Sequence, residues 1–161
     1  MKEKIDFNTK QNTLPSVSAY FSASIRGKKG SNATKKDIAE NIAAGKKMAN
    51  KIQKFFGSIL SMYVPHNQDE LIQILWYEKK ITVWDILDGD CKILAARDIM
   101  LVWIPGGYRS NGVTREIHAA TAVNMPIIEF EEFNSDVAKQ IFSEIYDVVK
   151  SKEDPLSPSV K

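Results

Sequence analysis

Two short segments of the sequence combine residue types suited to binding phosphate and to nucleophilic chemistry. In the first, Ser24, Ile25, Arg26 and Gly27 bring a hydroxyl, a guanidinium and a flexible backbone just ahead of an expected helix. Backbone amides at a helix start carry partial positive charge, and an arginine can hold two phosphate oxygens at once. This segment therefore predicts a phosphate-binding loop, with an ordinary surface loop as the alternative.

The second segment runs from Ser110 to Glu116 and supplies a carboxylate. Gly112 permits the close approach of a ligand, and Glu116 follows about one turn later in the next expected helix. That placement puts the carboxylate near a ligand crevice. The alternative is a glutamate that only complements the positive end of the helix dipole.

Several other chemistries are disfavoured by the pattern. The loop around Arg26 lacks the glycines of a Walker loop or of a dinucleotide-binding loop. His66 and His118 have no further ligands at metal spacing, so no zinc site is expected. His118 lies roughly opposite Glu116 around the helix, which argues against a catalytic pair. His66 is expected in solvent, with a place in the crevice as the alternative.

The single cysteine and the aromatic residues have simpler interpretations. Cys91 is expected on an apolar helix face together with Trp84, where a core role is favoured over a nucleophilic thiol. Among the other aromatic side chains, Tyr108 is the best candidate to stack on a nucleobase. Packing is expected for Trp76, Trp103 and Tyr108.

The elements that must position these residues alternate along the chain. Apolar side chains recur at helical intervals in residues 38–56, whereas residues 99–104 form an uninterrupted apolar run typical of a strand buried in a parallel sheet. Strands are predicted at 17–24, 59–64, 99–104 and 126–130, and helices at 38–56, 70–78, 82–94, 112–124 and 137–148.

This order predicts an α/β fold, a Rossmann- or flavodoxin-like three-layer sandwich with a mainly parallel sheet of four to five strands. Such sheets bind ligands at the carboxyl ends of their strands, where residues 22–30, 65–69 and 105–116 are expected to meet. The predicted organisation is a flexible leader at 1–14, one domain at 15–152 and a flexible tail at 153–161.

Charge is divided unevenly along the 161 residues. Residues 1–57 carry 12 Lys or Arg against 4 Asp or Glu, and the remainder carries 10 against 16, which together give the net charge of +2. The positive residues are not interleaved with aromatic ones, so binding to a nucleic acid polymer is disfavoured. A solvated helix face explains most of the lysines. The rest fit a site in which cations of the first half meet carboxylates of the second.

Cysteine content and hydropathy bear on the compartment. One cysteine cannot form an internal disulfide, so a reduced cytoplasmic setting is expected. The longest apolar stretch is far too short to span a bilayer, and no secretory leader is recognisable, so no membrane association is expected.

Three separated motifs together resemble the nucleoside 2-deoxyribosyltransferase-like superfamily, and within it the 2′-deoxynucleoside 5′-phosphate N-hydrolases. Residues 20–27, with the sequence YFSASIRG, are similar to that family's first strand and phosphate loop. Residues 90–98 are similar to the segment in which one aspartate precedes another by eight positions. Ser110, Gly112 and Glu116 resemble the serine, glycine and glutamate of the family's last site segment.

The resemblance implies roles for individual residues. Glu116 would be the nucleophile that attacks the anomeric carbon of the sugar, Asp90 would assist departure of the base or position the sugar, and Tyr20 would orient both sugar and nucleophile. Asp90 is favoured over the nearby Asp85 and Asp88 by its spacing from the next aspartate. The 5′-phosphate would be held by Ser24, Ile25, Arg26, Gly27, Ser110 and Gly112.

The expected function is hydrolysis of the N-glycosidic bond of a (deoxy)nucleoside 5′-monophosphate, without metal or cofactor. One alternative is a deoxyribosyltransferase that exchanges bases, although Arg26 speaks against an unphosphorylated substrate. A second alternative is a nucleotide-binding or sensor module without turnover. The resemblance also implies a homo-oligomer, most simply a dimer.

Overall fold

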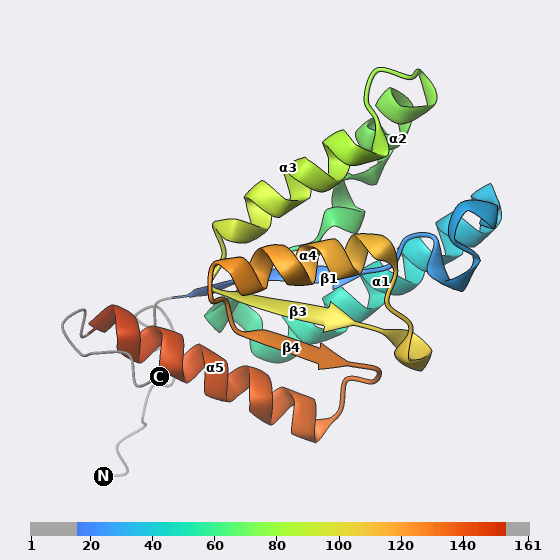
Figure 1. Ribbon diagram of the computed structural model, residues 1–161. Coiled ribbons are helices and arrows are strands. Elements are labelled where there is room, and N and C mark those ends of the chain that lie inside the picture. The colour runs from blue at the N-terminus through green and yellow to red at the C-terminus, as the bar shows by residue number, and fades with distance from the viewer. Residues whose placement is uncertain (1–15, 154–161) are drawn as a thin grey trace, which may run out of the picture.

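The computed structural model describes residues 16–153, so the predicted leader at 1–14 and the predicted tail at 153–161, apart from the helical Glu153, lie outside the described residues. Its four strands form one parallel sheet in the order β2-β1-β3-β4 (Figure 1). The topological switch point, where ligands bind in such sheets, lies between β1 and β3. The predicted fold class is confirmed, with four strands. These are β1 (Val17–Ala23), β2 (Leu60–Tyr63), β3 (Ile99–Trp103) and β4 (Ile127–Phe130).

Local sequence determines where the main helices begin and end. Thr34 and Asp37 form a capping box at the start of α1, and Thr82 and Asp85 form another at the start of α3. Helix α1 stops at Gly57, whose φ of +57° favours glycine. None of the helices in residues 16–153 combines the length and apolar character needed to cross a membrane. The helices are α1 (Lys35–Phe56), α2 (Asp69–Tyr77), α3 (Val83–Ala95), α4 (Asn111–Ala122) and α5 (Ser135–Glu153).

The sheet separates two cores because successive side chains of a strand point to opposite faces. From β1, Ala19 and Phe21 pack with Ile52 of α1 and with residues of α5. Tyr20 points to the other face and packs with Leu94 of α3 and with residues of α4. Figure 1 shows α4 and α5 on opposite sides of the sheet. The sheet is therefore the middle of three layers, and Tyr20 is directed towards α3 and α4.

Helix α3 departs from its predicted packing at its first turn. Leu94 near its end is fully buried, but Trp84 near its start is 64% exposed. Figure 1 shows α2 and the beginning of α3 extending past the edge of the sheet. The prediction that Trp84 belongs to the buried face is therefore wrong, because helical periodicity identifies a face but not how much of it the sheet covers.

His66 also differs from its prediction. It follows β2 and is only 1% exposed, rather than lying in solvent. Its ring lies edge-on to Phe21 and against Gly45 of α1, where a Cβ atom would come within 2.9 Å of the imidazole. Burial, assisted by the charge of Lys46, lowers the pKa of His66 to about 4. The missing side chain of Gly45 is what lets the imidazole fit under α1.

Candidate active site

Glu116 lies at the centre of the candidate site, with both of its carboxylate oxygens held by β1. It is 7% exposed and projects from α4 towards the sheet. The Tyr20 hydroxyl donates to Oε1 at 2.7 Å, and the Ser22 hydroxyl donates to Oε2. Tyr20 and Ser22 are two residues apart and so share one face of the strand. The carboxylate is therefore fixed in one orientation.

Burial dominates the electrostatics of this cluster. It raises the pKa of Glu116 to about 7, and the negative charge of Asp90 adds to the rise, while the hydrogen bonds from Ser22 and Tyr20 oppose it. Burial also raises the pKa of Tyr20, and the nearby Glu116 and Asp90 add to that effect. Tyr20 therefore remains a hydrogen-bond donor at neutral pH, where Glu116 can gain or lose its proton.

The structure distinguishes the three candidate aspartates of α3. Asp85 belongs to the capping box at the helix start, and Asp88 forms an ion pair with Arg115 of α4. Asp90 is the aspartate whose charge acts on both Glu116 and Tyr20. Of the three, Asp90 is therefore the aspartate near Glu116 and Tyr20, and its role in the chemistry stays a prediction.

The loop after β1 has a fixed conformation that depends on glycine. Ser24 Oγ accepts a hydrogen bond from the Gly27 N–H at 2.9 Å, and Asn41 of α1 donates to the Ile25 carbonyl at 2.9 Å. Gly27 has a φ of +58°, and a Cβ there would come within 3.0 Å of the Asn41 amide. This tight turn follows directly from the strand that carries Tyr20.

Three cations of this loop have different surroundings. Lys29 pairs with Asp37 at 2.7 Å, so its charge is already matched. The Lys28 ammonium lies against Gly106 of the loop after β3, 3.4 Å from where a Cβ on that glycine would be. The guanidinium carbon of Arg26 lies 5.3 Å from the centre of the Trp76 ring. Arg26 and Lys28 are therefore the cations available to an anion at this edge of the sheet.

Ser110 and Gly112 form the first turn of α4. Ser110 caps the helix by accepting the Val113 N–H at 3.2 Å. Gly112 packs closely on α3, because a Cβ there would contact Leu87 at 3.4 Å. In a helix capped in this way, the N–H groups of the first residues, here Asn111 and Gly112, have no intrahelical acceptor. They are the backbone donors that an anion could use.

The remaining nucleophile candidates are less suitable. Cys91 is half-buried, and burial together with the negative charge of Glu116 raises the pKa of its thiol, which disfavours a thiolate. His118 is exposed, in contrast to the buried Glu116 on the same helix. Among the residues that the structure describes, no three His, Cys, Asp or Glu side chains are grouped so as to bind a metal ion.

Ser22 is the residue of this site that the sequence analysis did not single out. Its signal was a hydroxyl inside a buried strand, two positions after Tyr20 and thus on the same face. The contact of Trp76 with Arg26 was also not expected, since Trp76 was assigned to packing. No local pattern could predict that contact, because it joins α2 to a loop 50 residues earlier in the chain.

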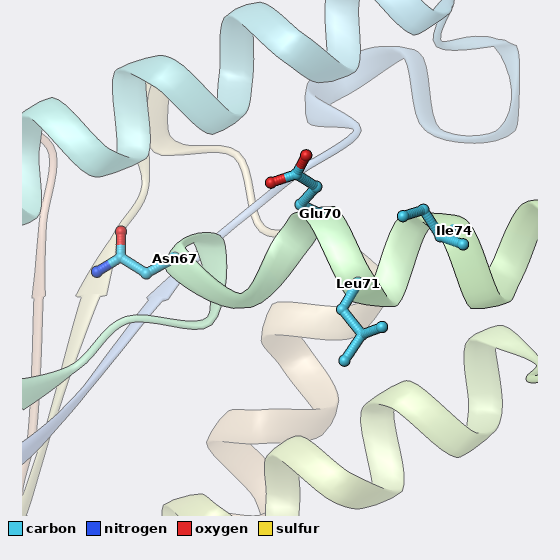
Figure 2. A pocket seen from close by; sticks show the side chains of 4 residues that line it. All are labelled: Asn67, Glu70, Leu71 and Ile74. Carbon is cyan, nitrogen blue, oxygen red and sulfur yellow. The ribbon is translucent and has the colours of Figure 1, made fainter.

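Grooves elsewhere on the surface do not coincide with the Glu116 cluster. One of about 380 Å³ runs along α2 and is lined by Asn67, Glu70, Leu71 and Ile74 (Figure 2). Another, larger and mostly apolar, lies between α1 and α5. Glu116, Tyr20 and Ser22 are instead buried where β1 packs against α4, with Asp90 of α3 near them.

Comparisons with known proteins add no identification. No protein family, curated protein or solved structure matches this chain.

Proposed function

We propose that this protein hydrolyses the N-glycosidic bond of a (deoxy)nucleoside 5′-monophosphate to give the free base and the sugar 5-phosphate. The observation that carries the proposal is the buried Glu116 carboxylate, held on both oxygens by Tyr20 and Ser22 with the charge of Asp90 nearby. A fixed carboxylate nucleophile beside a second acid is what retaining glycosyl transfer requires. The resemblance to the N-hydrolases implies these roles for Glu116, Asp90 and Tyr20.

The first chemical step uses the ionised form of Glu116. One carboxylate oxygen attacks C1′ of the sugar, a C–O bond forms, and the C1′–N bond breaks with its electron pair leaving on the base. Asp90, in its protonated form, supplies the proton that neutralises the departing base. Tyr20 and Ser22 keep the carboxylate aligned with C1′, because each donates to a different oxygen.

The second step releases the enzyme. Asp90, now a carboxylate, accepts a proton from a water molecule as the water oxygen attacks C1′. The glycosyl–Glu116 bond breaks, and its electron pair returns Glu116 to the carboxylate form. The sugar 5-phosphate leaves, and the first protonation states are restored. Negative charge on Glu116 in the first step, and on Asp90 and the departing Glu116 carboxylate in the second, stabilises the positive charge that develops on the sugar ring.

Arg26 favours a phosphorylated substrate over an unphosphorylated one. Within residues 16–67 and 70–153 it makes no ion pair or hydrogen bond, so its donors are available to a phosphate. Lys28 lies in the loop after β1, and α4 begins after the loop that follows β3. The Lys28 ammonium and the first-turn amides of α4 therefore lie at the same edge of the sheet. In the proposed complex, these positive groups surround the phosphate and the carboxylates surround C1′.

The deciding experiment incubates the full chain with a panel of ribo- and deoxyribonucleoside 5′-monophosphates and measures free base by chromatography. Glu116→Gln is the inactive control, and Asp88→Asn is a matched carboxylate change outside the cluster. Release that depends on Glu116 supports the proposal, and no release from any monophosphate overturns it. Base exchange on unphosphorylated nucleosides would favour the transferase. Nucleotide binding without turnover, equal in wild type and Glu116→Gln, would favour a binding module.

The proposal includes a homodimer in the cytoplasm. The dimer follows from the resemblance, and the reducing compartment follows from the single cysteine. Light scattering of the purified protein tests the first, and fractionation of cells tests the second. A monomer at the concentrations used for activity measurements would remove the dimer from the proposal.

A further inference from the structure

Arg26 has an unusual environment for an arginine beside an active site. Its guanidinium lies over the Trp76 ring, with the central carbon 5.3 Å from the ring centre. In the described part of the chain no carboxylate pairs with it. Both side chains are half-buried. An arginine has several rotatable bonds, so without a partner it would sample many positions, and the ring face restricts them.

Helix α2, which carries Trp76, is itself attached to the neighbouring elements by aromatic contacts. The Trp76 and Tyr77 rings lie 5.2 Å apart, and the Lys35 ammonium at the start of α1 lies 4.9 Å from the Tyr77 ring centre. Figure 2 shows α2 beside the loop that follows β1. Two cation–π contacts therefore connect the end of α2 to the loop and to α1.

A stacked guanidinium can still bind an anion. The ring attracts the positive charge through its π face, whereas the N–H donors lie in the plane of the guanidinium. Stacking on one face thus leaves in-plane donors for two phosphate oxygens. An acidic partner at the same place would instead compete with phosphate for these donors.

We propose that Trp76 is a positioning residue that holds Arg26 ready for the substrate phosphate, and that this contact makes the site select phosphorylated over unphosphorylated sugars. The inference rests on the proposed function and extends it to the origin of phosphate selectivity. It assigns to α2 a role that no residue of the Glu116 cluster provides. Trp76 acts through Arg26 and not on the reacting atoms.

The test measures binding of 2-deoxyribose 5-phosphate and of 2-deoxyribose to the full chain by isothermal titration calorimetry. Trp76→Leu is expected to weaken binding of the phosphorylated sugar about 5-fold and to leave binding of the free sugar unchanged. Trp76→Phe, which keeps an aromatic face, is expected to restore affinity to within about 2-fold of wild type. With a monophosphate substrate, Trp76→Leu should raise KM by a similar factor at unchanged kcat.

Two comparisons separate positioning from general destabilisation. Trp84→Leu makes the same change at another tryptophan in contact with an arginine, since the guanidinium carbon of Arg115 lies 5.3 Å from the Trp84 ring centre. This variant should leave the affinity for the phosphorylated sugar unchanged. In an Arg26→Gln background, Trp76→Leu should have no further effect, since the contact is already lost. Trp76→Gln, which lacks a π face, replaces the leucine variant if that protein does not fold.

The outcomes distinguish this inference from the proposed function. If wild type prefers the phosphorylated sugar and Trp76→Leu shows the same preference, the role of Trp76 is overturned while the proposed function stands. If Trp76→Leu weakens binding of the phosphorylated sugar as much in the Arg26→Gln background as in wild type, Trp76 does not act through Arg26. If wild type binds both sugars equally, or binds neither, the role of Trp76 in phosphate selection is overturned, while base release from the monophosphates still decides the proposed function.

Discussion

Replacing Glu116 by Gln is expected to stabilise the protein above neutral pH while abolishing the proposed reaction. The folded protein raises the pKa of this carboxyl from 4.5 to about 7, mainly through burial. Between these two values the folded state binds more protons at Glu116 than the unfolded chain does. Stability therefore falls as pH rises across this window, and the loss is complete above pH 7.

The size of the effect follows from the two pKa values. At about 1.4 kcal/mol per pH unit, the change corresponds to about 3 kcal/mol of unfolding free energy. Glutamine is neutral at every pH, so it does not incur this loss. At pH 8.5 the variant should exceed wild type by about 3 kcal/mol, or about 10 °C in Tm for a chain of this size. Near pH 4.5 the difference should almost vanish.

Urea unfolding of both proteins between pH 4.5 and 8.5 measures this difference directly. Other groups that titrate in the window, His66 among them, occur in both proteins, so their contributions cancel when wild type is subtracted. Asp88→Asn, which changes an exposed carboxylate, should show no comparable pH dependence. A difference between wild type and Glu116→Gln that stays constant with pH would refute the argument that burial sets the pKa of Glu116.

Three further predictions follow from the same contacts. The kcat/KM of wild type should rise with pH through about 7 as Glu116 ionises. Ser22→Ala should move this rise upwards by about one pH unit, because the Ser22 hydroxyl stabilises the carboxylate. A pH profile that does not move would argue against that hydrogen bond. Asp90→Asn should lower kcat about 100-fold or more in the base-release assay, whereas Asp88→Asn should change kcat less than about 3-fold. Equal losses of kcat in the two variants would contradict the role assigned to Asp90. Because burial lowers the pKa of His66 to about 4, the folded protein should lose stability as pH falls from 6.5 to 4. His66→Leu should reduce that loss of unfolding free energy by roughly 3 kcal/mol in urea unfolding. The same fall in stability below pH 6.5 in both proteins would contradict this prediction.

Much of the fold could be predicted because its signals are local. Periodicity predicts helices at 38–56 and 82–94, and these correspond to α1 and α3, which are capped by Thr34 and Thr82. The apolar run at 99–104 was identified as a buried strand, and β3 lies inside the sheet. His66 could not be placed in this way. Its burial depends on the notch at Gly45, 21 residues earlier in the chain, and no local pattern records which helix will cover a strand end.

The sequence by itself determined the alternation of strands and helices, and hence the edge of the sheet at which Arg26 and Glu116 must be sought. It also identified Tyr20 and Glu116 as candidates, without showing that they touch. Tertiary structure decided which side chains form the cluster, because β1, α3 and α4 each supply only part of it. The Ser22 hydroxyl, the charge of Asp90 and the Trp76 face acquire their roles only when the chain folds and removes water from between them.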